Sequence, residues 1–229
     1  MPGSGAQTAA SVPPIDARQP AKVETATFAL GCFWAPDALF GVRPGVVRTR
    51  VGYSGGTTKS PSYHRLGDHT ETVQMDYDPT VVSYRDLLQL FWDSHAPTRM
   101  PTSLQYMSIV FYQDDEQRKL AAEGKRRVRA TTGKDVFTEI RRLNEFYRAE
   151  AYHQKYHLRQ VPDLTKEFAA FYPNNRDFTD STAVARVNGY LAGYGSVAGL
   201  EEELADLGLS AAGRRTLLDR VAALHGQAR

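Results

Sequence analysis

Residues 31–34, with the sequence Gly-Cys-Phe-Trp, constrain this chain more than any other stretch. The preceding residues 23–30 are largely β-branched and apolar and predict a strand, while residues 37–40 predict a turn of helix. Cys32 therefore stands where a strand ends and a helix begins. Free N–H groups at a helix start favour an anion, so we expect them to lower the pKa of the Cys32 thiol and make it a nucleophile.

Cys32 is the only cysteine among the 229 residues, and this bounds several other properties. It excludes an internal disulfide and any site built from several cysteines, and it fits a reducing, cytoplasmic compartment. The alternative for a lone cysteine is a small buried hydrophobic side chain without chemistry. The aromatic pair Phe33-Trp34 directly after Cys32 favours the reactive interpretation.

Composition and charge narrow the class of protein further. With 41% hydrophobic and 10% aromatic residues, the chain is able to bury a real core. The formal net charge of +2 and the lack of a sustained basic stripe predict no nucleic-acid partner, and the basic residues within 125–129 fit the solvated face of a helix. No apolar run is long enough to cross a membrane, and no secretory signal pattern is present, so we expect no membrane partner.

Local composition divides the chain into three parts. Residues 1–22 are rich in Pro, Ala, Gly and Ser and predict a disordered tail. Residues 23–175 mix strand and helix patterns and predict the main domain, and residues 176–229 predict a helical C-terminal extension packed on it. Further strands are predicted over 46–53, 69–76, 107–111 and 136–140. Further helices are predicted from a cap at Ser83 to about His95, from a cap at Asp163 to before Pro173, and over 114–130, 150–159, 181–192, 200–207 and 210–224.

Glu71 is the candidate acid. In the strand predicted over 69–76, Glu71, Val73 and Met75 point to the same face because side chains alternate along a strand. If that face is the core, the carboxyl is partly desolvated, and desolvation raises its pKa. A carboxyl that keeps its proton near neutral pH can donate it to a substrate. A glutamate at the sheet rim that reaches water is the alternative, and the spacing does not decide between the two.

Two patterns that often bind cofactors do not qualify here. The glycine-rich loop 52–56 lacks the Lys and Ser/Thr of a phosphate-binding loop, so we predict no nucleotide there. His153 and His157 stand four residues apart in the helix predicted over 150–159. No Glu follows His153 as in zinc proteases and no third ligand is evident, so we predict no metal and treat both histidines as helix-surface or pocket-wall residues.

A series of short motifs resembles the A-type peptide methionine sulfoxide reductases (MsrA). Each motif alone is weak, but together they follow the family's order between residues 27 and 159. The motifs are Gly31-Cys32-Phe33-Trp34, Gly52-Tyr53-Ser54-Gly55-Gly56, Pro61-Ser62-Tyr63, His69-Thr70-Glu71, Tyr77-Asp78-Pro79, Gln105-Tyr106 and Tyr152-His153-Gln154-Lys155-Tyr156. The resemblance implies an α+β fold, with a small mixed β-sheet flanked by helices in a ferredoxin-like two-layer core. Residues 23–175 would be the catalytic domain.

The resemblance also implies a role for each site residue. Cys32 would be the nucleophile that attacks the sulfoxide sulfur, and Glu71 the protonated acid that hydrogen-bonds the sulfoxide oxygen. Tyr63 and Tyr106 would share that oxygen, and the Phe33-Trp34 pair would form the apolar pocket for the S-methyl group. The products would be methionine and a sulfenic acid on the cysteine. The substrate would be methionine S-sulfoxide, free or in oxidised proteins, and no cofactor would be bound.

Two departures from the family pattern matter. Many members carry a resolving cysteine in a glycine-rich C-terminal segment, but the comparable stretch 188–195 has Leu191 and no thiol. An external thiol would then reduce the sulfenic acid: thioredoxin, glutaredoxin or a low-molecular-weight thiol. Many members also have an aspartate shortly before the Gln-Tyr pair, where Pro101 stands here. Either another group replaces that aspartate, or the backbone positions the substrate oxygen differently.

These observations predict a monomeric, single-cysteine methionine sulfoxide reductase. The missing resolving cysteine and aspartate leave an alternative from another class, a catalytically weak sulfoxide-binding or redox-sensing homologue. A reductase of another alkyl sulfoxide is a third interpretation.

Overall fold

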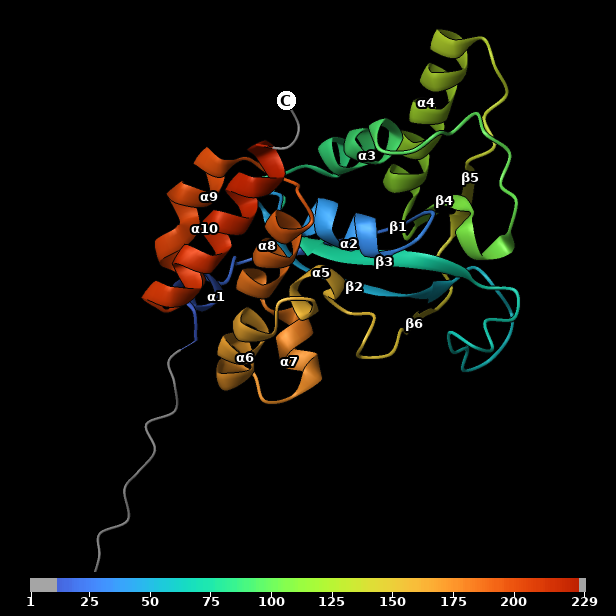
Figure 1. The fold of residues 1–229 in the computed structure, drawn as a ribbon. Coiled ribbons are helices and arrows are strands. Elements are labelled where there is room, and N and C mark those ends of the chain that lie inside the picture. The colour runs from blue at the N-terminus through green and yellow to red at the C-terminus, as the bar shows by residue number, and fades with distance from the viewer. Residues whose placement is uncertain (1–11, 227–229) are drawn as a thin grey trace, which may run out of the picture.

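The computed structural model describes residues 12–226, and at its centre lies a six-stranded sheet with the order β5-β4-β1-β3-β2-β6 (Figure 1). The strands are β1 (Glu24–Leu30), β2 (Val46–Ser54), β3 (Thr70–Tyr77), β4 (Ser108–Tyr112), β5 (Glu139–Arg142) and β6 (Phe146–Arg148). The helices are α1 (Pro14–Ala17), α2 (Trp34–Gly41), α3 (Tyr84–Asp93), α4 (Asp115–Thr132), α5 (Tyr156–Arg159), α6 (Pro162–Phe171), α7 (Asn175–Asp180), α8 (Thr182–Leu191), α9 (Val197–Glu203) and α10 (Ala211–Gly226), with 3-10 turns η1 (Leu104–Tyr106) and η2 (Leu204–Leu207). No helix within residues 12–226 has the length and apolar character needed to span a bilayer.

Four strands and two helices have the ferredoxin-like arrangement. Along the chain β1, α2 and β2 are followed by β3, α3 and β4, and the neighbours β4-β1-β3-β2 are antiparallel throughout. β5 joins β4 in parallel, which makes the sheet mixed. In Figure 1, α2 and α3 lie on the same side of the sheet, and they share a buried apolar cluster with β1 and β3 that includes Phe28, Val73 and Phe91. The predicted α+β fold class is confirmed.

Helix α8 packs directly on α2 and ties the C-terminal helices to the core. A Cβ on Gly189 would lie 2.6 Å from the carbonyl oxygen of Ala38, so glycine permits this close approach. Asn188 is fully buried, and its amide donates to the Asp37 carboxylate in α2. The stretch 188–195, compared above with a resolving-cysteine segment, is therefore the last turn of a packed helix and the turn that follows it.

The N-terminal segment differs from the expected disordered tail over the described residues 12–22. Residues 14–17 form α1, and the Asp16 carboxylate accepts hydrogen bonds from the hydroxyls of Tyr172 and Ser181, each at 2.7 Å. Asp16 also accepts from the backbone N–H of Thr182, so it supplies negative charge at the start of α8. Composition does not reveal such a long-range contact. Residues 1–11 of the expected tail lie outside the described residues.

The helix predicted over 150–159 is wrong for most of its length. Only the four residues of α5 are helical, and Lys155 before them has a left-handed φ of 56°. The side chain of Gln154 hydrogen-bonds both the N–H and the C=O of Val51 in β2, each at 2.9 Å. Buried contacts of residues 153–155 therefore decide the backbone here and outweigh local helix propensity.

Candidate active site

Cys32 stands between β1 and α2, as the sequence predicts. Gly31 makes the turn with φ of 95°, a conformation that side chains other than glycine rarely adopt. The thiol of Cys32 is free and exposed at the surface. Phe33, the N-cap of α2, follows at once, so the sulfur lies next to the N–H groups of the first helical turn.

The expected lowering of the Cys32 pKa is wrong for the protein without substrate. Partial desolvation by the surrounding protein raises the pKa of the thiol, and the negative charge of Glu71 raises it further. The hydrogen bond from the backbone N–H of Trp34 acts in the opposite direction but is the smaller effect. One N–H donor at the start of the helix does not compensate for the water that the thiol loses and for the nearby carboxylate of Glu71.

Glu71 faces the core, and the alternative of a solvated rim glutamate is wrong. Its strand β3 lies between β1 and β2, and the residue is 1% exposed. One carboxyl oxygen, Oε2, accepts from the backbone N–H of Phe33 at 3.0 Å, and the other, Oε1, accepts from Nε2 of Gln105 at 2.7 Å. Desolvation raises the pKa of Glu71, while these two hydrogen bonds partly oppose the rise. The expected direction is therefore confirmed.

Tyr63 and Tyr106 join the same site from two separate loops. Tyr106 ends η1 and is 43% exposed. Desolvation raises the pKa of its hydroxyl, and the charges of Glu71, Tyr63 and Cys32 raise it further. Tyr63 is held through its backbone N–H, which donates to Oε1 of Glu150 at 3.0 Å. The structure thus brings together all four residues that the resemblance implies as catalytic.

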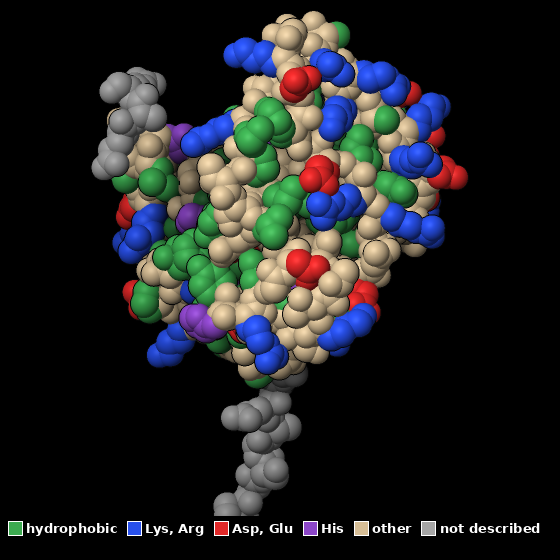
Figure 2. All heavy atoms as spheres, turned by 90° about the vertical axis from the view of Figure 1, so that its right-hand side faces the viewer, with side chains coloured by type: hydrophobic (Ala, Val, Ile, Leu, Met, Phe, Trp, Pro, Cys, Tyr) green, Lys and Arg blue, Asp and Glu red, His purple; other side chains and the backbone are tan. Residues whose placement is uncertain are grey.

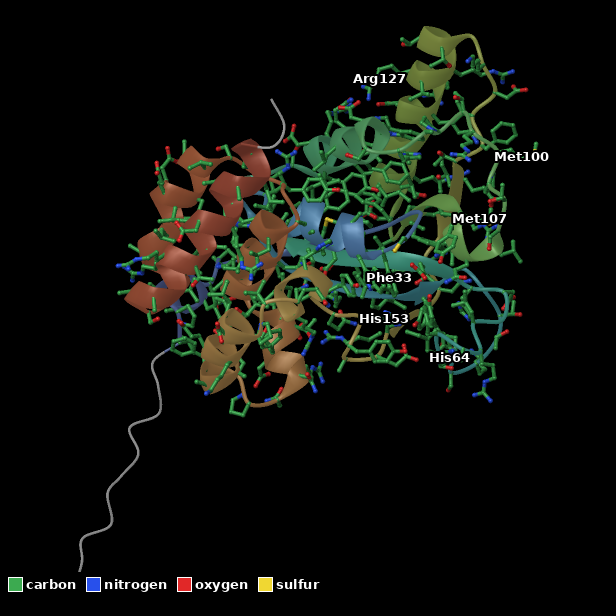
Figure 3. All side chains as sticks on the ribbon, in the orientation of Figure 1. Phe33, His64, Met100, Met107, Arg127 and His153 are labelled. Carbon is green, nitrogen blue, oxygen red and sulfur yellow. The ribbon has the colours of Figure 1, made fainter. Side chains whose placement is uncertain are left out.

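Trp34 and Phe33 lie beside the thiol in different ways. The Trp34 ring stacks on Tyr156 with centroids 3.7 Å apart, and its Nε1 donates to Nδ1 of His153 at 3.3 Å. Phe33 is only 1% exposed because its ring packs between Tyr53 and His153. Figure 3 labels Phe33 and His153, which lie close together below the sheet's centre. Trp34 therefore presents apolar surface at the site, and Phe33 forms the layer behind it.

His153 is a pocket-wall residue. It is 2% exposed, and its ring lies 4.6 Å from that of Tyr63 and 4.2 Å from that of Tyr152. Desolvation lowers its pKa, so the ring is neutral at physiological pH. Among residues 12–226 no group of three or more His, Cys, Asp and Glu side chains is arranged to hold a metal ion.

Several residues that support the site were not identified from the sequence. Lys155 and Asp37 form a buried ion pair, and Glu150 accepts from the hydroxyl of Tyr53 at 2.7 Å as well as from Tyr63. Gln105 lies in the Gln105-Tyr106 motif, but the sequence does not predict its contact with Glu71. The only available signal was that each of these residues lies in or beside one of the motifs quoted above.

Exposed apolar side chains lie on η1, in the loop before it and next to His153. Leu104 and Tyr106 of η1, Met100 before them and Tyr152 next to His153 are among the exposed large hydrophobic residues of the described chain. Figure 2 shows hydrophobic side chains gathered near the middle of the face at the right of Figure 1, with Lys and Arg along one side. This surface is suited to an apolar polypeptide segment as well as to a small molecule.

The fold and this site define a class of protein that comparison with known families identifies. Residues 24–186 match the family model described as peptide methionine sulfoxide reductase. The chain belongs to this family, which makes it an oxidoreductase. The match extends beyond residue 175, where the sequence predicts the end of the catalytic domain, so that boundary stays a prediction.

Individual relatives agree with the family match. The peptide methionine sulfoxide reductase of Drosophila melanogaster is 39% identical over 205 residues, covering 89% of this chain and 82% of the relative. Peptide methionine sulfoxide reductase A5 of Arabidopsis thaliana is 40% identical and covers 74% of this chain and 68% of the relative.

Solved structures are similar in fold. The crystal structure of reduced Mxr1 from Saccharomyces cerevisiae has a TM-score of 0.56 at 30% identity and covers 63% of this chain and 88% of that one. Methionine sulfoxide reductase A of Corynebacterium diphtheriae has a TM-score of 0.54 at 32% identity and covers 62% of this chain and 76% of that one.

Proposed function

We propose that this protein reduces methionine S-sulfoxide to methionine, with Cys32 as the nucleophile and Glu71 as the acid. One observation carries the proposal: the buried carboxyl of Glu71 is hydrogen-bonded to the backbone N–H of Phe33, the residue directly after Cys32. A sulfoxide oxygen leaves only when it is protonated, so the reaction needs a thiolate and a protonated acid side by side.

The two groups are placed to exchange the one proton that the reaction needs. Desolvation raises the pKa of both the Cys32 thiol and the Glu71 carboxyl, which favours the protonated form of each. The form with thiol and carboxylate and the form with thiolate and carboxylic acid differ only in where that proton lies. The thiolate sulfur attacks the sulfoxide sulfur while the oxygen receives the proton, and the substrate S–O bond breaks. The released hydroxyl oxygen then bonds to the cysteine sulfur, and the new S–S bond breaks with its electron pair going to the methionine sulfur. The products are methionine and a sulfenic acid on the cysteine.

The remaining site residues bind the substrate. The hydroxyls of Tyr63 and Tyr106 are donors for the sulfoxide oxygen, and the exposed part of Trp34 contacts the S-methyl group while Phe33 supports it from behind. The substrate is small, neutral and polar at one atom, which suits an aromatic wall with few donors. The exposed apolar side chains of Leu104, Tyr106 and Tyr152 favour substrate within oxidised proteins in addition to the free amino acid.

An external thiol completes the cycle because no second cysteine exists in the chain. Its sulfur attacks the sulfenic acid of Cys32, water leaves, and a second thiol resolves the mixed disulfide and regenerates the cysteine. Thioredoxin, glutaredoxin and low-molecular-weight thiols are the candidates. We propose a cytoplasmic monomer without a bound cofactor, since a lone catalytic cysteine depends on a reducing compartment.

A single-turnover experiment tests the proposal. Reduced protein is mixed with methionine S-sulfoxide without added thiol, and we expect one methionine and one sulfenate per protein, with neither product from Cys32→Ser. Binding without release of methionine would instead favour the sulfoxide-binding or redox-sensing alternative. Comparing dimethyl sulfoxide with free and peptide-bound methionine sulfoxide distinguishes the third interpretation. Undiminished turnover by Cys32→Ser would contradict the proposed chemistry.

A further inference from the structure

Gln105 makes a contact that the reaction described above does not use. Its Nε2 donates to Oε1 of Glu71 at 2.7 Å, while the backbone N–H of Phe33 donates to Oε2 at 3.0 Å. Each carboxyl oxygen therefore has one donor from a different segment. Two such donors define both the position and the plane of the carboxyl group.

The segment that carries Gln105 is itself fastened to β3. Oγ1 of Thr70 donates to the carbonyl oxygen of Leu104 at 2.6 Å, and Oγ of Ser103 accepts from the backbone N–H of Gln105 at 3.2 Å. Two neighbouring residues of β3, Thr70 and Glu71, thus hold two neighbouring residues of η1. The next residue along η1 is Tyr106.

We propose that Gln105 is the positioning residue for Glu71, holding its carboxyl in place opposite Cys32 and favouring its ionised form. This inference rests on the proposed role of Glu71 as the acid. An amide donor stabilises a carboxylate more than a carboxylic acid, so it opposes the effect of burial and helps the acid to release its proton.

The test measures the protonation of Glu71 directly. In a Cys32→Ser background, the infrared carbonyl band of the protonated carboxyl is followed against pH and assigned by subtracting the Glu71→Gln spectrum. Gln105→Met keeps the length of the side chain but removes the donor. We expect the ratio of protonated to ionised Glu71 at a fixed pH to rise about tenfold. Gln105→Glu should move the titration further in the same direction, because two adjacent carboxyls share one proton.

Two control variants separate the amide from its surroundings. Thr70→Val loosens η1 but keeps the Gln105 amide, and Gln89→Met makes the same chemical change on the surface of α3. Gln89→Met should titrate like the parent, and Thr70→Val should move the titration less than Gln105→Met does. With Cys32 present, the single-turnover pH profile of Gln105→Met should have its Glu71 limb at higher pH and a lower plateau.

Three results would overturn the inference. An unchanged infrared titration in Gln105→Met would do so whatever the activity, and so would an equal displacement in Thr70→Val. A lower rate in Gln105→Met with an unmoved pH profile would assign it a merely structural role. Failure of the proposed function is a different result, namely methionine release by Cys32→Ser or by Glu71→Gln at the parent rate.

Discussion

Nζ of Lys155 lies 2.7 Å from Oδ1 of Asp37, and both side chains are almost completely buried. Nζ also donates to the carbonyl oxygen of Thr49 at 2.6 Å and to its hydroxyl oxygen at 2.7 Å. The pair joins the first turn of α2 to the segment before α5, and Cys32 and His153 stand beside these two anchors. Its electrostatics therefore hold the nucleophile and the aromatic wall in one arrangement.

Lys155→Met should destabilise the protein strongly, because the Asp37 carboxylate would remain buried without a counter-charge. The expected loss in the free energy of unfolding is about 3–5 kcal/mol, measured by urea denaturation. Lys119→Met, which breaks an exposed contact with Glu116, is the control and should cost less than about 1 kcal/mol. Equal losses in the two variants would contradict a structural role for the buried pair.

Glu71→Gln should reduce single-turnover activity by about 10²–10⁴-fold yet make the protein more stable at neutral pH. The folded-state pKa lies above its usual value of 4.5, so ionising this carboxyl costs folding energy. Well below pH 4.5 the carboxyl is protonated in both states and the cost is absent. The cost grows as the pH rises from about 4.5 to the folded-state pKa and is constant above it. The melting temperature of the variant should therefore exceed that of the parent increasingly above pH 4.5.

The matched control for this prediction is Glu123→Gln, since Glu123 forms an ion pair with the exposed Arg85 at 3.8 Å. It should keep both the activity and the pH dependence of stability. A Glu71→Gln protein that melts below the parent at pH 7 would show that the carboxylate stabilises the fold there, contrary to the raised pKa.

Protonation of His153 should break its hydrogen bond with the indole of Trp34. Indole Nε1 is only a donor, so Nδ1 of His153 must accept and the neutral ring carries its proton on Nε2. Desolvation lowers the pKa of His153 from 6.5; Glu150 opposes this and His64 adds to it. The contact should persist as the pH falls through 6.5 and break only below it. Trp34 fluorescence in a Trp92→Phe background measures this transition.

A His153→Gln variant is the control for that titration. It retains a side-chain acceptor for the indole but does not titrate, so the fluorescence change below pH 6.5 should disappear. A transition of equal size in this variant would assign the signal to another group.

Asp16→Ala tests the role of α1. The variant removes the acceptor for Tyr172, Ser181 and the start of α8, and we expect a loss of about 1–3 kcal/mol in unfolding free energy. The catalytic rate should not change, because none of these contacts involves the cysteine site. Asp219→Ala, on α10, is the control. An unchanged melting temperature in Asp16→Ala would show that α1 contributes nothing to stability.

The amino-acid sequence by itself determined the main strands and the position of the nucleophile. Alternation along 69–76 is strong enough to place Glu71 on the same face as Val73, and the change from strand to helix pattern places Cys32 at the junction. Local patterns succeed here because burial of one face is a property of consecutive residues. β6 and α7 were not predicted, since both are short and carry little periodic signal.

Only the tertiary structure decided the electrostatics and the supporting contacts. The pKa of Cys32 depends on the carboxylate of Glu71, which lies 39 residues further along the chain. It also depends on the water that folding excludes from the thiol. The backbone conformation before α5 depends on the contact between Lys155 and Asp37, which lie 118 residues apart in the sequence. Such effects fall steeply with distance in space and have no fixed relation to distance in sequence, so no local pattern encodes them.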